Sequence, residues 1–313
     1  MPSPVATLTL NPAIDIAYCV KQLVPGVKTE STEFLCDPGG NGINVSRGLR
    51  LLGIPAHTCC VLAGKSGAML RALLEDEVDL LDVVEGDGLT RFNCTIDQRR
   101  PPEEFKIKGV GPRLSEEAFE EVTRRFRECA GLGYGVLTGS APPGWDTSVY
   151  IELSGQLRDQ GARAVIDTEG SVLREITRTR PFLIKPNLGE LEDVSGLLLK
   201  TVEAIAEQAR KLQLDGAEFV AVSLGCDGAV LVTPDNSYYG NAPQVSHRCS
   251  TGAGDAFLAG LLAEFIVSGD PEKVLVRGLA CGTGTTAQPG SRLFELSALG
   301  RFEEMIEVRQ LDI

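Results

Sequence analysis

Short apolar stretches alternate with longer helical ones through the middle of the chain. Strands are predicted at 135–138, 164–167, 182–184 and 219–223, and helices at 147–160, 172–177 and 202–213. Strands that are separated by helices are typical of a parallel sheet covered by helices on both faces. Right-handed crossovers bring the carboxyl ends of such strands to one edge, where α/β proteins bind their ligands. The chain is therefore predicted to be an α/β protein whose site lies at this edge.

Size and charge narrow the class further. With 313 residues, of which 43% are hydrophobic, the chain can bury a large core, and we expect residues 1–313 to form one domain. A net charge of −13 argues against a nucleic-acid partner, so phosphate must be bound locally. The sequence has no apolar run long enough to span a membrane, and Met1–Thr7 has no basic, apolar leader. These features favour a cytoplasmic protein.

Cysteine and histidine usage limits the chemistry that the chain can perform. The nine cysteines are odd in number and include no Cys-x-x-Cys pair, which is typical of free thiols in a reducing compartment. The two histidines are His57 and His247. They leave little room for a histidine-based metal site or a catalytic triad.

Several extended runs do not fit the strand–helix alternation. They lie at Ile16–Val20, Glu30–Leu35, Thr90–Ile96 and Phe105–Val110, and we expect them to form a small accessory sheet inserted at about 15–36 and 90–110. Period-two alternation would place Arg91 and Asn93 on one face of the third run. Arg91 could bind a substrate phosphate there, or it could be a surface residue of an edge strand.

A glycine-rich turn comes before an apolar helix near residue 255. The small residues Thr251–Gly254 lead into a helix predicted at Ala256–Val267. The first N–H groups of a helix lack intrahelical acceptors and carry the positive end of its dipole, so this turn is suited to phosphate. Asp255 could take a proton from an attacking hydroxyl at this point. The alternative is an ordinary first-turn residue that the dipole stabilises.

A second glycine cluster comes before another amphipathic helix. The stretch Gly39–Gly42 has three glycines around Asn41, and Asn44 follows in the first helical turn. Glycines would allow the backbone to approach a ligand that the Asn44 amide faces, and a tight turn with a solvated Asn44 is the alternative. Asp15 follows the strand predicted at Val5–Leu10, so it could contact a ligand or cap the turn.

Common nucleotide and hydrolase motifs do not occur in the sequence. There is no GxxxxGK[ST] and no GxGxxG, which disfavours P-loop kinases and Rossmann dehydrogenases. There is no GxSxG elbow either, which disfavours an α/β-hydrolase.

The motifs taken together resemble one known family. The pieces that carry the resemblance are, in chain order, Thr9–Asp15, Gly39–Arg47, Thr90–Asn93, Thr138–Gly144, Lys185–Glu190, Ser223–Ala229 and Gly252–Asp255. From Thr7 to Arg292 the chain resembles the phosphofructokinase B (PfkB) group of ribokinase-like carbohydrate kinases. The resemblance implies a three-layer α/β/α fold with a mainly parallel sheet. It also implies that the accessory strands form a lid, through which two copies of the chain can form a homodimer.

The resemblance further implies ATP-dependent phosphorylation of a sugar phosphate. It makes Asp255 the base, with an anion hole for the transferred phosphoryl group formed by Gly252, Ala253 and Gly254. The residues implied to hold the sugar phosphate are Asp15, Gly40, Asn41, Asn44, Arg91, Asn93 and Ser140. Those implied to bind ATP are Lys185, Asn187, Ser223, Gly225 and Gly228, with Mg²⁺ held through water by Glu190.

The sequence leaves the acceptor sugar open. Thr9–Asp15 is similar to 1-phosphofructokinases and tagatose-6-phosphate kinases, which implies fructose 1-phosphate first. Asn41, where many relatives have Lys, and the segment ending at Arg292 are more similar to 6-phosphofructokinase. Cys249 stands where relatives usually have Asp or Ser. A nucleoside or free-sugar kinase and a sugar-phosphate sensor without turnover are remoter alternatives.

Overall fold

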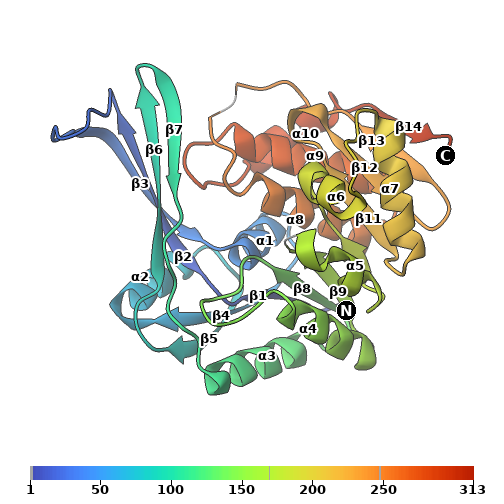
Figure 1. The fold of residues 1–313 in the computed structure, drawn as a ribbon, viewed down its shortest axis with the longest axis horizontal. Coiled ribbons are helices and arrows are strands. Elements are labelled where there is room, and N and C mark those ends of the chain that lie inside the picture. The colour runs from blue at the N-terminus through green and yellow to red at the C-terminus, as the bar shows by residue number, and fades with distance from the viewer. Residues whose placement is uncertain (1–2, 169, 247) are drawn as a thin grey trace.

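A ten-stranded sheet is the central layer of the computed structural model (Figure 1). The structure describes residues 3–168, 170–246 and 248–313, so His247 lies outside the described residues. The strand order is β14-β13-β12-β11-β10-β9-β8-β1-β4-β5. Strands from β11 to β5 in this order run parallel, whereas β12, β13 and β14 join antiparallel. The strand bounds are β1 Val5–Thr9, β4 His57–Ala63, β5 Leu80–Gly86, β8 Tyr134–Thr138, β9 Arg163–Asp167, β10 Leu183–Ile184, β11 Phe219–Ser223, β12 Ala229–Val232, β13 Ser237–Gly240 and β14 Val308–Leu311.

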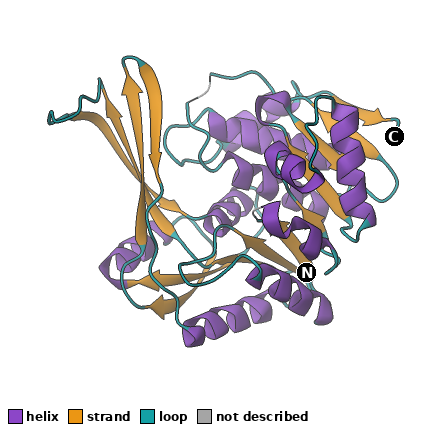
Figure 2. Cartoon of the chain, in the orientation of Figure 1, coloured by secondary structure: helices purple, strands orange, loops and turns teal. Residues whose placement is uncertain are grey.

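Helices cover both faces of this sheet, as Figure 2 shows. One face carries α3 (Glu116–Ala130), α4 (Val149–Asp159), α5 (Leu173–Thr177), α6 (Leu188–Ser195) and α7 (Val202–Leu214). The other face carries α1 (Asn41–Leu51), α2 (Gly64–Leu74), α8 (Ala253–Val267), α9 (Pro271–Thr286) and α10 (Leu296–Glu303). The predicted three-layer α/β/α architecture with a mainly parallel sheet is confirmed.

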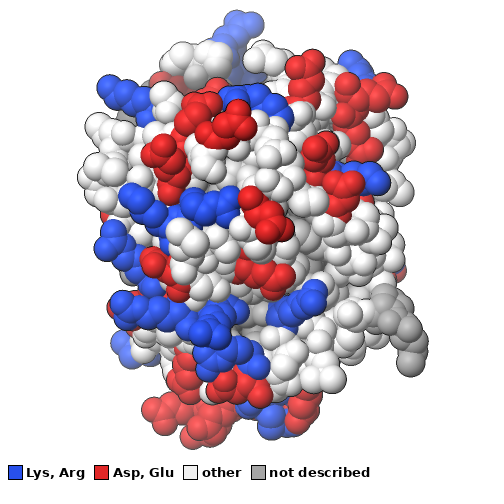
Figure 3. All heavy atoms as spheres, turned by 90° about the vertical axis from the view of Figure 1, so that its right-hand side faces the viewer, with Lys and Arg blue, Asp and Glu red and all other residues white. Residues whose placement is uncertain are grey.

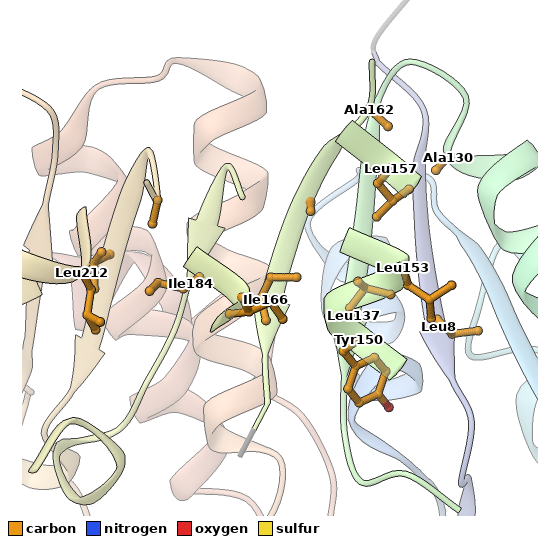
Figure 4. Packing of buried hydrophobic residues seen from close by; sticks show 14 of the residues in the cluster. Leu8, Ala130, Leu137, Tyr150, Leu153, Leu157, Ala162, Ile166, Ile184 and Leu212 are labelled. Carbon is orange, nitrogen blue, oxygen red and sulfur yellow. The ribbon is translucent and has the colours of Figure 1, made fainter. Parts of the chain in front are cut away.

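Alternating strand residues supply the two main cores. Leu8 of β1 packs into the core beneath α3 to α7, whereas Val5 of the same strand packs into the core beneath α1, α8 and α9. Figure 4 shows Leu153 and Leu157 of α4 lying against Leu8 and the neighbouring strands. A fully buried leucine contributes about 2 kcal/mol to the stability of the fold. This packing fixes the strand ends that carry the site.

The sequence pattern does not predict the two edge strands of the sheet. No strand is expected where β5 lies, and a helix is expected over 299–308, whereas α10 ends at Glu303 and β14 begins at Val308. Both edges are partly open to solvent and include charged residues, such as Asp82 in β5 and Arg309 in β14. Charge at an edge strand blunts edge-to-edge pairing and also weakens the apolar pattern.

Several helix boundaries also differ from the prediction. The sequence pattern predicts helices that begin at Ala68 and Ala256, whereas α2 begins at Gly64 and α8 begins at Ala253. Gly67 and Gly254, which are expected in turns, therefore lie in the first turns of these helices. The sequence pattern predicts a loop at Lys185–Glu190, whereas helix α6 already begins after Asn187, whose side chain accepts from the Glu190 N–H. This N-cap satisfies an otherwise unpaired donor and stabilises a short helix.

The predicted accessory sheet is present as four strands in the order β3-β2-β6-β7. Their bounds are β2 Ala13–Val20, β3 Ser31–Gly39, β6 Arg91–Arg99 and β7 Pro102–Ile107. Figure 1 shows these strands projecting from one end of the molecule beside the edge of the central sheet. Because β2 begins at Ala13, Asp15 lies on an accessory strand rather than in the turn that is predicted after β1.

The register of the accessory sheet gives it two different faces. One face, which looks toward the central sheet, carries polar groups, and Asn93 donates to Asp15 across it. The opposite face carries apolar residues in register, including Tyr18 beside Phe34 at 5.3 Å between ring centroids. Phe34 is 55% exposed and Ile107 is 58% exposed on this second face. We call it the outer face.

The remaining surface carries charges of both signs. On the side turned to the viewer in Figure 3, acidic and basic residues are mixed. One surface ion pair joins Arg309 of β14 to Glu203 of α7 at 3.1 Å. All nine cysteines are free thiols. Among the described residues, no helix is long and apolar enough to cross a membrane.

Candidate functional site

Two cavities adjoin the edge where the parallel strands end. The first, of about 380 Å³, lies between the accessory sheet and this edge. The second, of about 360 Å³, lies between the turn after β11 and helices α8 and α9. The predicted site residues that line the first cavity are Asp15, Asn41, Arg91, Asn93, Ser140 and Glu190. Those that line the second are Ser223, Gly225, Gly228, Ala253 and Gly254.

Asp255 is held by two asparagines from another helix. Asn41 Nδ2 donates to Asp255 Oδ1 at 2.9 Å, and Asn44 Nδ2 donates to Asp255 Oδ2 at 2.9 Å. The three residues are far apart in the sequence and meet because α1 packs along α8. Asp255 is 5% exposed, while Asn41 lines the first cavity. The carboxylate therefore lies just behind the cavity wall with both oxygens oriented.

The surroundings of Asp255 favour a base that works near neutral pH. Burial, with the negative charge of Asp167, raises the pKa of Asp255 to about 7, although Asn44, Lys185 and Asn41 each oppose the rise. Lys185 is buried and pairs with Asp167 at 3.1 Å. Burial lowers the pKa of Lys185, but the charge and hydrogen bond of Asp167 and the charges of Asp255 and Glu190 together outweigh it, so the pKa is raised. The lysine thus stays cationic beside Asp255.

Arg47 fixes the orientation of Asn44. One Arg47 Nη1 hydrogen bond of 3.1 Å goes to Asn44 Oδ1, which leaves the Asn44 Nδ2 to face Asp255. The same guanidinium donates to the carbonyls of Pro38 and Ser291 and pairs with Glu77 at 3.0 Å. Since Arg47 is 5% exposed, its bonds to Asn44, Pro38 and Ser291 are shielded from water, and they hold α1 against the end of β3 and the loop at Ser291.

The turn before α8 has the geometry that suits an anion. Gly252 is the N-cap residue with φ of 81°, a left-handed conformation that favours glycine, and no described side chain caps this end of the helix. A Cβ built on Gly254 would lie 3.7 Å from Lys185 Nζ, so this ammonium adjoins the first turn. The Ala253 N–H donates to the Ser250 carbonyl at 3.3 Å. The start of a helix, the positive end of its dipole and a cation therefore lie together here, an arrangement that favours phosphate binding.

The accessory sheet contributes an oriented polar group to the first cavity. Asn93 Nδ2 donates to Asp15 Oδ1 at 2.8 Å. Burial raises the pKa of Asp15, against the opposing effects of the Asn93 hydrogen bond and the Arg91 charge. Arg91 donates to the Asn11 carbonyl at 2.8 Å and to the Gly109 carbonyl at 3.3 Å, while its buried Nε has no partner among the described residues. The guanidinium is thus fixed with donor capacity to spare.

Ser140 and the turn before it complete the wall of this cavity. Gly139 has φ of 89°, and a Cβ there would lie 3.3 Å from Asn41 Oδ1, so a side chain would be strained and crowded. Ser140 follows, with its Oγ 3.4 Å from Asn11 Nδ2. Gly40, the N-cap residue of α1, has φ of 123° and brings the start of the helix to the same edge.

The second cavity is mainly apolar and opens beside the α8 turn. Ser250 and Gly254 stand on its side nearest the first cavity, and Phe257 and Leu279 supply apolar walls. Gly228 cannot carry a side chain, because φ is 101° and a Cβ would overlap the Gly240 carbonyl. A flat apolar group with a phosphate tail directed toward Gly254 fits this arrangement.

Asn187 and Glu190 form a capping box at the start of α6. Asn187 N donates to Glu190 Oε2 at 2.9 Å, and Glu190 N donates to Asn187 Oδ1 at 2.9 Å. A bridge pairs Asn187 with Ser223, so both residues lie at the sheet edge between the cavities. Within the described residues, no cluster of three or more His, Cys, Asp or Glu could hold a metal ion by itself.

The structure adds residues that the motifs do not single out. Asp37, Asp167, Lys106 and Lys108 line the first cavity, and Arg47 supports Asn44 behind it. Asp167 ends a predicted strand, so its position alone could have marked it. Lys106 and Lys108 are two residues apart on β7 and its extension, so they share one face of the strand, as Arg91 and Asn93 do on β6.

Comparisons with known proteins show the family to which the chain belongs. The model of the pfkB family carbohydrate kinases matches residues 8–297. A 1-phosphofructokinase of Bacillus subtilis is 33% identical over 279 residues, which cover 89% of this chain and 91% of the relative. The ATP-dependent 6-phosphofructokinase isozyme 2 of Escherichia coli is 30% identical over 289 residues, which cover 92% and 94%.

A solved structure extends the agreement to the fold. The phosphofructokinase-2 of Escherichia coli, crystallised in complex with substrates and products, superposes with a TM-score of 0.92 at 28% identity. The match covers 96% of this chain and 99% of that one. The chain therefore belongs to the pfkB family of carbohydrate kinases, and it is a kinase.

Proposed function

We propose that the protein transfers the γ-phosphoryl group of ATP to fructose 1-phosphate and so forms fructose 1,6-bisphosphate. One observation carries the proposal: an oriented carboxylate, Asp255, adjoins an uncapped helix N-terminus at the junction of two cavities. One cavity is polar and cationic in part, and the other is mainly apolar. A sugar phosphate suits the first, and a nucleotide suits the second.

We assign each of these groups a role in the reaction. Asp255 takes the proton of the acceptor hydroxyl as its oxygen attacks the γ-phosphorus. A new oxygen–phosphorus bond forms, the bond from the γ-phosphorus to the β,γ-bridging oxygen breaks, and ADP leaves with that electron pair. We assign the transferred group to the turn of Gly252, Ala253 and Gly254, where the Ala253 N–H would exchange its 3.3 Å bond to the Ser250 carbonyl for one to the phosphoryl oxygen. Preorganised donors of this kind are worth about 3–4 kcal/mol each in other enzymes.

We assign ATP to the second cavity. The base and ribose would lie against Phe257 and the turn of Ser223, Gly225 and Gly228. The phosphates would extend toward Gly254, where Lys185 can neutralise charge. Asn187, next to Ser223, is close enough along the sheet edge to contact the same phosphates.

The acidic residues near the phosphates fit a magnesium ion that is bound mainly through ATP. Glu190 and Asp167 both line the first cavity, and they are the carboxylates that we assign to the ion, Glu190 through water. Magnesium keeps several waters and commonly uses one or two carboxylates together with substrate phosphates. When bound, the ion would screen the charge of the phosphates.

We assign the existing phosphate of the sugar to Arg91, with Asn93 and Ser140 nearby. The hydroxyl groups of the sugar we assign to Asp15 and Asn41, which line the same cavity, and to Gly40 and Asn44 beside them. Fructose 6-phosphate is the second candidate, because it also has one phosphate and one primary hydroxyl at opposite ends of a furanose. Both acceptors give the same bisphosphate. The likeness to a phosphofructokinase-2 over 96% of the chain favours this second candidate.

A coupled assay of ADP release tests the substrate directly. The panel is fructose 1-phosphate, fructose 6-phosphate, tagatose 6-phosphate, free sugars and nucleosides. We expect the highest kcat/KM with fructose 1-phosphate. A higher kcat/KM with an unphosphorylated acceptor would refute a sugar-phosphate kinase. Binding of sugar phosphates without any ADP release would support a sensor instead.

We further propose that the accessory sheet acts as a lid and that its outer face joins two copies of the chain. Phe34, Phe92, Phe105 and Ile107 are exposed there on a regular sheet surface. Burial of such a face in a second copy would remove it from water. Light scattering of the wild type and of Phe34→Asp with Phe105→Asp tests this, because a dimer should become a monomer. A monomeric wild type would refute it.

The cell compartment follows from the same chemistry. Free thiols throughout the chain are stable in a reducing environment, and ATP is the co-substrate that we propose. We therefore propose that the protein works in the cytoplasm.

A further inference from the structure

Lys106 lies where the two cavities meet. Its Nζ donates to Ser250 Oγ at 2.9 Å, and its side chain lines the first cavity together with Thr251. Ser250 lines the second cavity and comes directly before the turn at Gly252. Lys106 belongs to β7 of the accessory sheet, whereas Ser250 belongs to the body of the molecule. The contact therefore crosses from the sheet that we propose as a lid to the phosphate turn.

Two other cations near this point, Lys185 and Arg91, already have partners. The buried Lys185 pairs with Asp167, and two Arg91 nitrogens donate to main-chain carbonyls. Lys106 pairs with Glu104 at 2.9 Å, but the Lys106 side chain is 46% exposed and the Glu104 side chain is 34% exposed. An exposed pair of this kind is weak, so the Lys106 ammonium can change partner at little cost.

The first cavity needs additional positive charge for phosphoryl transfer. Asp15, Asp37, Asp167 and Glu190 line it, and Asp255 lies just behind its wall. Both proposed substrates carry phosphate, and charge spreads over the equatorial oxygens of the transferred group in the transition state. A cation at the junction of the cavities would stabilise that charge without contacting the far end of either substrate.

We propose that Lys106 is a catalytic residue which the accessory sheet brings to the transferred phosphoryl group when it closes. This inference rests on the proposed kinase function and adds a residue to it. The ammonium leaves Ser250 Oγ and donates to an equatorial oxygen of the γ-phosphoryl group as the hydroxyl oxygen attacks. No proton is transferred by Lys106, since it acts only through its charge and hydrogen bonds. Correct sugar binding, closure and charge stabilisation are thereby coupled.

Steady-state kinetics of Lys106→Ala test the proposal. We expect kcat to fall about 10²-fold, the loss typical of one donor to a transition-state anion, with the KM for sugar phosphate within about 3-fold of wild type. Lys106→Arg should recover most of this loss because it restores the charge. A kcat within 3-fold of wild type for Lys106→Ala overturns the proposal. So does a change confined to the KM for sugar phosphate, which would make Lys106 a binder of the existing phosphate.

Two variants on the same sheet separate this role from a structural one. Lys108→Ala, two residues away and closer along the chain to the Arg91 contact at Gly109, should raise the KM for sugar phosphate more than it lowers kcat. Glu104→Gln removes the negative charge that pairs with Lys106 while keeping the lysine and an acceptor oxygen at position 104, and kcat should stay within 3-fold of wild type. If Glu104→Gln loses as much kcat as Lys106→Ala, the lysine only holds the sheet closed and the proposal is overturned.

A binding measurement keeps this test independent of the acceptor sugar. The affinity of MgADP with fluoroaluminate, which mimics the transferred group, should fall about 10²-fold in Lys106→Ala, while the affinity of MgADP alone is unchanged. Equal affinities of wild type and variant for the mimic overturn the role of Lys106. A wild type that phosphorylates no sugar phosphate refutes the proposed function instead, and the fluoroaluminate result still decides the role of Lys106.

Discussion

Asn44 Nδ2 donates a hydrogen bond of 2.9 Å to Asp255 Oδ2, which joins helix α1 to helix α8 at the site. An amide nitrogen can only donate, so this contact favours the ionised carboxylate. Burial favours the protonated form and raises the pKa of Asp255 to about 7. The opposed effects leave a carboxylate that is basic enough to accept a proton and still ionised in good part at neutral pH.

Asp255→Asn should lower kcat by roughly 10²–10⁴-fold while substrate binding changes little, because an amide cannot accept the hydroxyl proton. In the wild type, kcat should rise with pH through a midpoint near 7, as Asp255 loses its proton. Measurement of kcat from pH 5 to 9 and of ligand affinity by calorimetry checks both statements. Near-normal turnover of the variant would remove Asp255 as the base.

The same substitution should change how stability depends on pH. The pKa of Asp255 is about 7 in the folded chain, whereas the ordinary pKa of an aspartate, expected in the unfolded chain, is 3.8. Between about pH 4 and 7 the unfolded chain therefore binds fewer protons than the folded one, and the wild type loses stability as pH rises. Asp255→Asn does not titrate, so its Tm relative to wild type should rise over that interval and level off above it. The full change is on the order of 4 kcal/mol at most. A Tm difference that is constant from pH 4 to 8 would contradict the raised pKa.

Arg47→Gln should lower kcat about tenfold and move the midpoint of its pH profile upward. Without Arg47, the Asn44 amide can turn, and the hydrogen bond that lowers the pKa of Asp255 weakens. Lys at position 47 should restore part of the effect. Glu77→Gln is the matched control, because Glu77 is 46% exposed and contacts Arg47 from the far side. An unshifted midpoint in Arg47→Gln would show that Arg47 serves packing alone.

Arg91→Ala should raise the KM for sugar phosphate by about tenfold or more, as expected when one charge-assisted hydrogen bond worth about 1.5–3 kcal/mol is lost. The KM for ATP should stay near the wild-type value, because Arg91 lines the first cavity only. Thermal melting of the variant is the control, since Arg91 also bonds two main-chain carbonyls. An unchanged KM in a folded variant would favour an unphosphorylated acceptor.

Two substitutions of Glu190 distinguish helix capping from a role beside magnesium. Glutamine preserves a capping box, so Glu190→Gln should leave Tm nearly unchanged while raising the Mg²⁺ concentration needed for half-maximal rate. Glu190→Ala should raise it as well and should also lower stability by about 1 kcal/mol. Magnesium titrations of the rate, with melting curves at fixed Mg²⁺, measure both. An unchanged magnesium requirement in Glu190→Gln would confine Glu190 to capping.

The interior of the fold and many of the site residues could be predicted from local pattern. Strands such as β8 and β11 are apolar throughout because helices cover both faces, so their limits are plain in the sequence. Strands β5 and β14 lie at the two edges of the sheet, where charged residues interrupt that pattern. Burial on both faces, which made the other strands recognisable, is what these two lack.

The contacts within the site could not be predicted in the same way. Asn44 and Asp255 are separated by 211 positions, and their hydrogen bond depends on how two helices pack. Asn41 was expected to face the sugar, and it lines that cavity while its Nδ2 also orients Asp255. Lys106 depends on how the accessory sheet leans over the body, which no local pattern specifies.

Asn41, Asn44 and Asp255 all belong to helices that cover the central sheet, and none belongs to the accessory strands. A swing of those strands would thus carry Asp15, Arg91 and Lys106 with it and leave the proton acceptor in register. A compound that wedges the two parts open should weaken capture of the sugar, yet the titration of the carboxyl group should be the same in the wedged and free enzyme.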